Sequence, residues 1–149
     1  MKDTVVAIVL GRKGSRGVTE KNTMDILGRP AFLYPLLATK NSQYIDIAFV
    51  STNDDRIIEG GKKMEFSIIK RPESLCTSEA LFEDALIHAY FKVKEKIGHQ
   101  PKYVVVLMCN AVTIDSTLVD TAIEMLENDS KADSTVTVSH FNMYSPLRA

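Results

Sequence analysis

The sequence predicts an α/β domain of three layers with a mostly parallel central sheet, and three observations support this class. Short β-branched runs alternate with longer stretches of helical period, which is the pattern of strands joined by crossover helices. Apolar residues make up 45% of the 149 residues, enough for a core, because a chain of this length buries roughly 70% of its unfolded surface. No linker or repeat divides the chain, so we expect a single domain over residues 1–149.

Five runs rich in β-branched and aromatic residues are predicted strands. They cover residues 5–10, 47–51, 66–70, 103–108 and 135–140. Four stretches with helical periodicity lie between them and are predicted helices. They cover residues 31–41, 54–64, 78–96 and 116–128.

Capping residues support the boundaries of these helices. The predicted N-caps are Asn53 or Asp54, Ser78, and Asp115 or Ser116, and the predicted C-terminal stops are Gly98 and Asn128. Residues 24–30 predict a tight turn that leads into the first helix, with Pro30 near its first position.

The most informative segment is the loop of residues 11–22, which follows the first predicted strand. It contains glycines at positions 11, 14 and 17 and four cationic side chains, Arg12, Lys13, Arg16 and Lys21. Glycine permits positive φ and lets backbone N–H groups approach an anion, while the cations supply charge that a nucleoside triphosphate would neutralise. Because ligands collect at the carboxyl ends of parallel strands, this loop is a predicted phosphate site. A solvated loop without function is the alternative, disfavoured because four close cations repel one another without an anion.

Two common phosphate-binding motifs do not fit this loop. A dinucleotide fingerprint needs a glycine where Lys13 stands and a helix that starts at once. A P-loop needs Gly-Lys-Ser/Thr at its end, which is absent. A nicotinamide-dependent dehydrogenase is therefore disfavoured.

Other polar residues allow two interpretations each. Arg71 follows the third predicted strand and could hydrogen-bond a base or a phosphate, or lie in a solvated turn. Asp54 and Asp55 could hold a metal, but their position at a helix start favours capping. His88 lies within a predicted helix and is interpreted as structural. The two cysteines, at positions 76 and 109, match no metal-ligand spacing and are predicted to be reduced thiols.

Composition excludes several classes of partner. With 18 basic and 19 acidic residues the formal net charge is −1, so general nucleic-acid binding is not expected. The apolar run at residues 4–10 is too short to cross a membrane and is followed by charge rather than a cleavage site. We therefore expect a cytoplasmic protein without a membrane partner.

Several segments, taken in order, resemble the acylneuraminate cytidylyltransferases, which make CMP-linked acidic sugars from CTP. They are residues 10–17 with Lys21-Asn22, then Leu27-Gly28-Arg29-Pro30, Val50-Ser51-Thr52-Asn53-Asp54 and Arg71-Pro72-Glu73-Ser74-Leu75. The resemblance implies a Rossmann-like nucleotidyltransferase (GT-A-like) fold. It also implies transfer of CMP from CTP to an acidic sugar-like acceptor, with release of pyrophosphate.

The resemblance further implies a set of nucleotide-binding residues. Those expected to handle the triphosphate are Arg12, Ser15, Arg16 and Lys21, those expected to contact the nucleotide are Asn22 and Arg71, and those expected to line the cytidine pocket are Leu10, Gly11 and Ala80. Arg12 and Lys21 are the predicted catalytic residues, because fixed cations stabilise charge that grows on the phosphates. Mg²⁺ is the expected cofactor, and no residue of this chain is assigned as its ligand.

Two departures from the family pattern change what is expected. Where the family commonly reads Leu-Gln-Pro-Thr-Ser-Pro-Leu-Arg, this chain has Leu107-Met108-Cys109-Asn110-Ala111-Val112-Thr113-Ile114, which predicts a different acidic sugar, or a phosphonate, as the acceptor. Family members also continue beyond this point and there supply paired aspartates for magnesium and a dimerisation arm. We therefore expect a chain that lacks the C-terminal part of the family fold and forms a homodimer, or alternatively a catalytically inactive nucleotide-binding or scaffold module.

Overall fold

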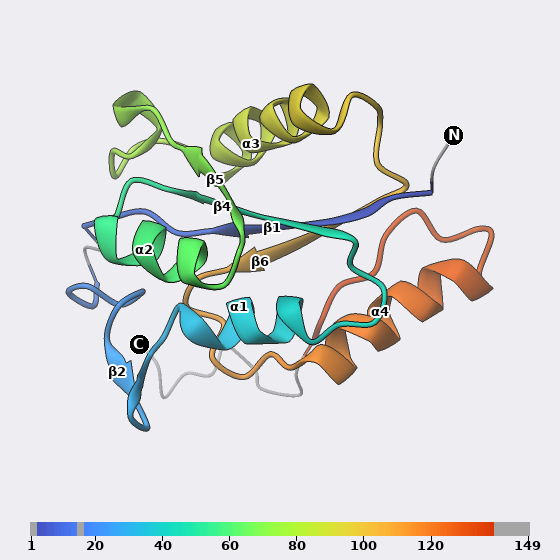
Figure 1. Cartoon of the computed structure of the whole chain (residues 1–149), viewed down its shortest axis with the longest axis horizontal. Helices are drawn as coiled ribbons and strands as arrows, with labels where there is room; N and C mark the ends of the chain where they lie inside the picture. The colour runs from blue at the N-terminus through green and yellow to red at the C-terminus, as the bar shows by residue number, and fades with distance from the viewer. Residues whose placement is uncertain (1–2, 15–16, 139–149) are drawn as a thin grey trace, which may run out of the picture.

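A four-stranded parallel sheet lies at the centre of the molecule (Figure 1). The computed structural model describes residues 3–14 and 17–138. The strand order is β5-β4-β1-β6, with β5 at Ser67–Lys70, β4 at Ile47–Thr52, β1 at Val5–Leu10 and β6 at Tyr103–Met108. These four strands confirm the predicted strands at 5–10, 47–51, 66–70 and 103–108 to within one residue at each end.

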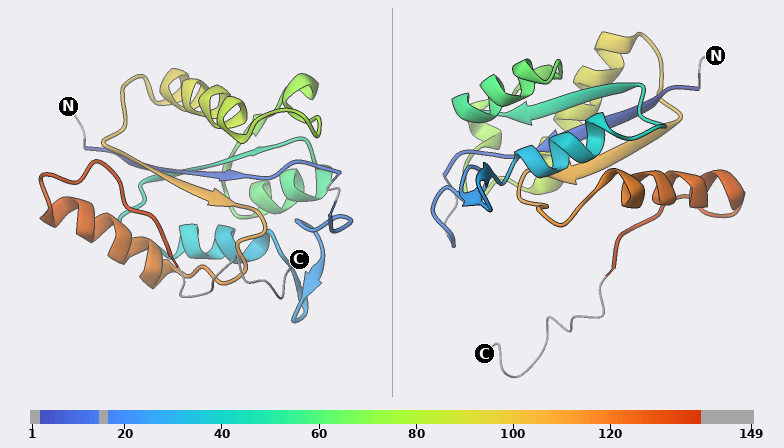
Figure 2. Two further views of the ribbon diagram at one scale, coloured as in Figure 1. Left: turned by 180° about the vertical axis from the view of Figure 1, so that it is seen from behind. Right: turned by 60° about the horizontal axis from the view of Figure 1, so that its bottom comes forward.

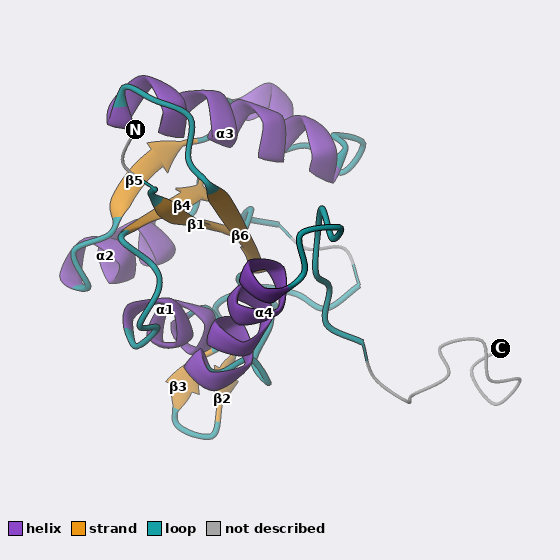
Figure 3. Cartoon of the chain, turned by 90° about the vertical axis from the view of Figure 1, so that its right-hand side faces the viewer, coloured by secondary structure: helices purple, strands orange, loops and turns teal. Residues whose placement is uncertain are grey.

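Helices cover both faces of this sheet and produce the three predicted layers (Figures 1 and 3). Helix α3 (Phe82–Ile97) packs on one face, and α1 (Leu33–Lys40), α2 (Asp55–Lys63) and α4 (Ser116–Asn128) pack on the other. Alternate residues of β1 serve the two cores. Val6, Ile8 and Leu10 contact the α3 side, and Val5 and Val9 contact the opposite side.

A small hairpin separates β1 from the first helix. Strands β2 (Asp25–Ile26) and β3 (Arg29–Pro30) pair antiparallel around Leu27 and Gly28, whose φ angles are 52° and 82°. This confirms the predicted turn at residues 24–30. The prediction that Pro30 lies near the first helical position is wrong, because its backbone pairs with Asp25 in the hairpin and α1 begins three residues later.

Of the five predicted helix ends four are confirmed, including the end of α4 at Asn128, and one is wrong. Asp54 accepts a hydrogen bond from the backbone N–H of Arg56 at 2.9 Å, Asp115 accepts one from that of Leu118 at 2.8 Å, and Gly98 ends α3 with φ 76°. Ser78 does not cap α3. The Thr77 hydroxyl accepts the Ala80 N–H at 3.1 Å in a tight turn, so the helix starts only at Phe82.

The fifth predicted strand is not formed over the residues that the structure describes. Residues 135–138 follow α4 without joining the sheet (Figure 2), and the rest of that prediction, residues 139–140, lies outside the described part. The Thr135 hydroxyl donates to the carbonyl of Ala122 in α4 at 3.1 Å. β-Branched residues favour a strand only where a neighbouring strand offers hydrogen bonds, and this segment runs along a helix instead.

Among the described residues, no helix has the length and apolar character that a membrane span requires.

Candidate functional site

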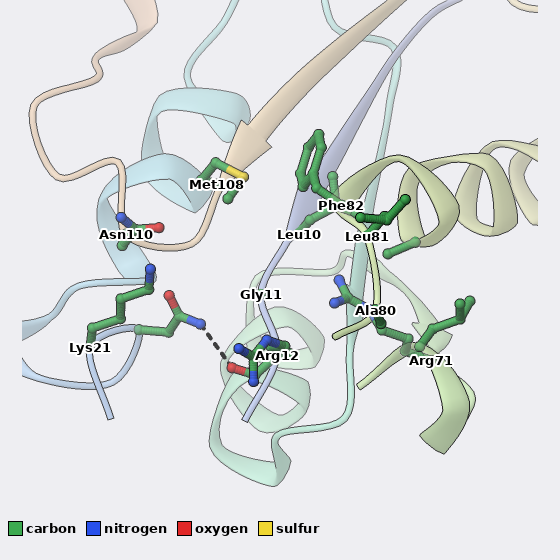
Figure 4. A pocket seen from close by; sticks show the side chains of 13 residues that line it. Leu10, Gly11, Arg12, Lys21, Arg71, Ala80, Leu81, Phe82, Met108 and Asn110 are labelled. Atoms are coloured by element: carbon green, nitrogen blue, oxygen red, sulfur yellow. Dashed lines mark hydrogen bonds between the residues drawn. The ribbon is translucent and has the colours of Figure 1, made fainter. Parts of the chain in front are cut away.

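A pocket opens at the carboxyl edge of the sheet, where β1, β5 and β6 end. We call it the sheet-edge pocket; Figure 4 shows the side chains around it. Its lining comes from the glycine-rich loop, from the turn after β5, from the start of α3 and from the end of β6. The residues are Leu10, Gly11, Arg12, Lys21, Asn22, Arg71, Leu75, Ala80, Leu81, Phe82, Ala85, Met108 and Asn110.

The bottom of the pocket is fixed by a close approach of two chain segments. The Cys109 N–H donates to the Leu10 carbonyl at 2.8 Å, and the Gly11 N–H donates to the Ser51 carbonyl at 3.2 Å. A Cβ atom on Gly11 would lie 2.5 Å from the Cys109 sulfur, closer than atoms can pack. Glycine is needed here because of this contact and not because of a positive φ, which in this loop only Gly14 adopts among the described glycines.

Arg71 is the buried cation of the site, with 6% of its surface exposed. Its Nη2 donates to the Ser51 carbonyl at 3.0 Å, and its Nε lies 3.4 Å from the Ser51 hydroxyl. Burial lowers the pKa of this guanidinium, and the positive charge of Arg12 lowers it further. The contacts with Ser51 hold the Arg71 side chain at the bottom of the pocket.

Asn22 braces the glycine-rich loop from below. Its side chain is buried, with 6% exposed, and its Nδ2 donates to the Arg12 carbonyl at 3.0 Å (dashed line in Figure 4). The loop is held on its other side by Asn53, whose Oδ1 accepts the Lys13 N–H at 2.8 Å. The Arg12 guanidinium donates to the Gly14 carbonyl at 2.6 Å. These bonds fix the loop backbone while Lys21 stays exposed above it.

A second hollow continues from the pocket along the loop. Arg12, Lys21 and Asn22 line both, and the second hollow is closed by Thr19, Glu20, Asp54 and other loop residues. A bound molecule that starts in the sheet-edge pocket can therefore extend past Arg12 and Lys21. This arrangement suits an anionic tail attached to a larger group.

We divide the lining into a floor and a rim. The floor consists of Leu10, Gly11, Asn22 and Arg71, all of which are buried. The rim consists of Arg12, Lys21, Leu81, Phe82 and Met108, all of which are exposed or half-buried.

The structure brings together all the predicted site residues that it describes. Leu10, Gly11, Arg12, Lys21, Asn22, Arg71 and Ala80 line the sheet-edge pocket. The predicted residues Ser15 and Arg16 lie outside the described part of the chain. The individual roles of these residues stay predictions.

Sequence reasoning found Leu10 and Ala80 but missed the other apolar residues of the pocket, Leu75, Leu81, Phe82, Ala85 and Met108, as well as Asn110. Met108 and Asn110 could have been found, because Met108 ends a predicted strand and Asn110 follows it, so both must reach the same edge as the loop. Leu81 and Phe82 were missed because the wrong choice of Ser78 as the cap placed them inside the predicted helix and not at its start.

The remaining candidate polar groups have structural roles or none that the contacts reveal. Asp54 caps α2, as the favoured interpretation predicted, and among the described residues no three His, Cys, Asp or Glu side chains gather as a metal site. Burial lowers the pKa of His88, which lies within α3. Cys109 is buried and its pKa is raised to about 12 by burial, whereas Cys76 is partly exposed. Both are free thiols in the structure.

Comparison with known proteins identifies the family. The family model described as Cytidylyltransferase matches residues 6–146. The chain belongs to the cytidylyltransferase family. One curated relative, the N-acylneuraminate cytidylyltransferase of Escherichia coli O18:K1:H7 (strain RS218 / NMEC), is 23% identical over 147 residues, which is 99% of this chain and 34% of the relative.

A second relative combines two activities in its name. It is the "Pseudaminic acid cytidylyltransferase and UDP-2,4-diacetamido-2,4,6-trideoxy-beta-L-altropyranose hydrolase" of Helicobacter pylori (strain ATCC 700392 / 26695), 29% identical over 76 residues, or 50% of this chain and 15% of the relative. The chain thus spans about a third of the first curated relative and less of the second. The expected resemblance to acylneuraminate cytidylyltransferases is confirmed.

Solved structures confirm the predicted nucleotidyltransferase fold. CMP:2-keto-3-deoxy-manno-octonic acid synthetase complexed with CTP aligns with a TM-score of 0.67 at 18% identity, over 85% of this chain and 48% of that one. A cytidylyltransferase from Leptospira borgpetersenii serovar Hardjo-bovis (strain JB197) aligns with 0.62 at 18%, over 85% and 50%. 4-Diphosphocytidyl-2C-methyl-D-erythritol synthase aligns with 0.68 at 11%, over 88% and 57%. At these identities the likeness establishes the fold.

Proposed function

We propose that this chain is the nucleotide-binding part of a cytidylyltransferase that transfers CMP from CTP to an acidic sugar-like acceptor and releases pyrophosphate. The observation that carries the proposal is the sheet-edge pocket, where the cations Arg12, Lys21 and Arg71 share one cavity with apolar side chains. A nucleotide matches both groups, because its flat base suits the apolar side chains and its charged tail suits the cations. The names of the relatives, which include an N-acylneuraminate and a pseudaminic acid cytidylyltransferase, support an acidic sugar as the acceptor.

The chemistry requires positive charge close to the phosphates. A hydroxyl oxygen of the acceptor forms a bond to the α-phosphorus of CTP, the bond from that phosphorus to the pyrophosphate oxygen breaks, and the hydroxyl proton is released. Negative charge grows on the oxygens around the α-phosphorus and on the departing pyrophosphate. Cations that are already in position lower this barrier. We assign this role to Arg12 and Lys21, with Ser15 and Arg16 as further triphosphate-binding residues.

Arg71 and Asn22 are proposed to hold the nucleoside from below. A guanidinium has five N–H donors, and the contacts of Arg71 with Ser51 occupy only Nε and one terminal nitrogen. The remaining donors are available to a base or a sugar above them. Leu10, Gly11 and Ala80 complete this part of the pocket.

Magnesium stays a prediction from the resemblance. Asp54 and Glu20 border the second hollow, but Asp54 caps α2 and Glu20 pairs with Arg56 at 2.9 Å. With no group of three potential ligands among the described residues, these residues do not form a magnesium site of their own. We therefore derive no step of the reaction through the metal.

Isothermal titration calorimetry tests the proposed site. Wild type, Lys21→Ala and Lys62→Ala are titrated with CTP, with and without magnesium. Lys62 is an exposed lysine of α2 and lies outside the sheet-edge pocket, so its variant controls for the loss of one surface charge. We expect Lys21→Ala to bind CTP at least about tenfold more weakly, because a charge-assisted contact is worth about 1.5–3 kcal/mol. Equal affinity in all three proteins would reject the site.

A catalytically inactive nucleotide-binding module is the second candidate. It is favoured by Met108, which lines the pocket in the segment where the family commonly has glutamine. Pyrophosphate release from CTP, measured across a panel of acidic sugars, separates the two candidates. Turnover with any of these acceptors would exclude the inactive module.

A further inference from the structure

An aromatic ring on the rim has no role in the site as described so far. Phe82 lines the sheet-edge pocket and is 40% exposed, beside Met108 at 41% and Leu81 at 62%. Figure 4 shows the ring above Leu10, between Met108 and Leu81. Large apolar side chains gathered at the mouth of a pocket are covered from water only when a ligand lies against them.

The fold explains why this ring overhangs the pocket. Leu81 is extended, with φ −70° and ψ 147°, so α3 starts with Phe82 at its first position. Residues three and four apart share a helix face, and Phe82 therefore lies on the stripe that contains Ala85, Ala89 and Val93. Those three residues are buried against the sheet. Phe82 is the member of the stripe at the carboxyl edge, and there it lines the pocket.

The chemistry of the pocket indicates what covers the ring. Arg12 and Lys21 supply positive charge in the same cavity, and Leu10 of the floor and Ala85, each only 2% exposed, line it together with Phe82. A planar, weakly polar group that carries an anionic tail matches both parts. Aromatic side chains stack well on nucleobases, because every base presents a π-face.

We propose that Phe82 stacks on the base of the bound nucleotide. The pocket therefore binds a nucleotide more tightly than a polyphosphate that lacks a base. The proposal rests on the proposed function, which places CTP in this pocket. Stacking does not read the hydrogen-bonding groups of a base. Phe82 therefore contributes affinity for any nucleobase, while selection of cytosine belongs to polar groups of the floor.

Calorimetry with two probes separates stacking from charge. CTP and inorganic tripolyphosphate, which has no base, are titrated into wild type, Phe82→Ala, Phe82→Trp and Phe91→Ala. Phe91 is a matched control, because it lies on the same helix, is 61% exposed and does not line the pocket. We expect Phe82→Ala to weaken CTP about tenfold, the effect of losing one stacked base, and to leave tripolyphosphate affinity unchanged. Phe82→Trp and Phe91→Ala should retain wild-type affinity for CTP.

Each other result overturns a defined part of the proposal. If Phe82→Ala binds CTP as tightly as wild type, stacking is refuted and the proposed nucleotide site stands. If Phe82→Ala loses affinity for CTP and tripolyphosphate equally, the ring acts by shaping the pocket and stacking is again refuted. If wild type binds tripolyphosphate but not CTP, the proposed function fails, and the inference with it. Thermal unfolding of each variant confirms that the comparison is made on folded protein.

Discussion

The floor and the rim of the sheet-edge pocket differ in what their groups contact. Gly11, Asn22 and Arg71 on the floor are packed against or hydrogen-bonded to the protein itself. Lys21 and Phe82 on the rim are exposed. The contacts of the floor therefore contribute to folding in the absence of a ligand, whereas Lys21 and Phe82 on the rim keep exposed surface that a ligand can cover.

This difference gives each region its own measurement. A substitution on the floor should change the free energy of unfolding of the ligand-free protein, because it breaks contacts that already exist. A substitution on the rim should leave that free energy almost unchanged and lower ligand affinity. The following predictions test whether the division holds, beginning with the largest effect.

Gly11→Ala should be the most damaging of these substitutions. The new methyl would meet the sulfur and Cβ of Cys109 at 2.5 and 2.6 Å, and both segments are fixed by backbone hydrogen bonds. Overpacking of this kind costs about 1–3 kcal/mol, and we expect about 3, seen as a midpoint of thermal unfolding lowered by roughly 6–10 °C. Gly17→Ala is the control, because no atom lies within 4 Å of its Cβ position. Equal midpoints of thermal unfolding for Gly11→Ala and Gly17→Ala would contradict the close approach of Gly11 to Cys109.

The buried thiol of Cys109 predicts a loss of stability in alkali. Burial raises its pKa from an ordinary 9.0 to about 12 in the folded protein, so the unfolded chain loses this proton at lower pH than the folded one. The contribution of the Cys109 thiol to the free energy of unfolding is therefore fully present below pH 9 and is lost as the pH rises toward 12. The loss is at most about 1.4 kcal/mol per pH unit.

Urea unfolding at about pH 8 and about pH 10.5 measures this contribution. Wild type should lose about 2 kcal/mol more than Cys109→Ala between the two conditions. Cys76→Ala, which removes the partly exposed thiol, should follow wild type much more closely. An identical pH dependence in Cys109→Ala and wild type would show that the thiol does not titrate in this way.

Two asparagines that hold the same loop give a direct comparison of buried and exposed bonds. Asn22→Ala removes a buried donor from the Arg12 carbonyl, and Asn53→Ala removes an exposed acceptor from the Lys13 N–H. An unsatisfied buried group costs about 1–3 kcal/mol, whereas an exposed group finds water. We expect a loss of about 1 kcal/mol for Asn22→Ala and half of that or less for Asn53→Ala, measured by urea unfolding. The reverse order would show that the bond to Asn53 holds the loop more firmly than the buried bond from Asn22.

The sequence contained most of the information about the fold. The β-branched run at Val5–Leu10 and the helix at Ser116–Asn128 were predicted with their observed bounds, because periodicity and capping report on local structure. Residues 135–138 were wrongly placed in a strand, since β-propensity says nothing about whether a partner strand is available. Ser78 was wrongly chosen as a cap because Thr77, its neighbour, takes the turn instead.

The charged part of the site was predicted over the described residues, whereas only Leu10 and Ala80 were predicted from its apolar part. Glycines and cations after a strand are a visible pattern, so Arg12 and Lys21 were found from the loop alone. Phe82 and Met108 carry no such pattern, because an apolar residue in a sequence looks the same whether it joins the core or lines a pocket. Only the start of α3 and the end of β6, as folded, place them at the carboxyl edge.

Lys21→Ala should have the smallest effect on stability, and for that reason it tests the division of the pocket most sharply. Lys21 stands next to Asn22 in the chain, but its side chain is exposed, so its removal should change the free energy of unfolding by no more than about 0.5 kcal/mol. Urea unfolding of Lys21→Ala and of the surface control Lys62→Ala should therefore coincide. Without ligand, removing one of several neighbouring cations can even stabilise the loop slightly, because like charges repel. A loss above about 1 kcal/mol would mean that Lys21 supports the fold as Asn22 does, and the boundary between floor and rim would then have to move to include it.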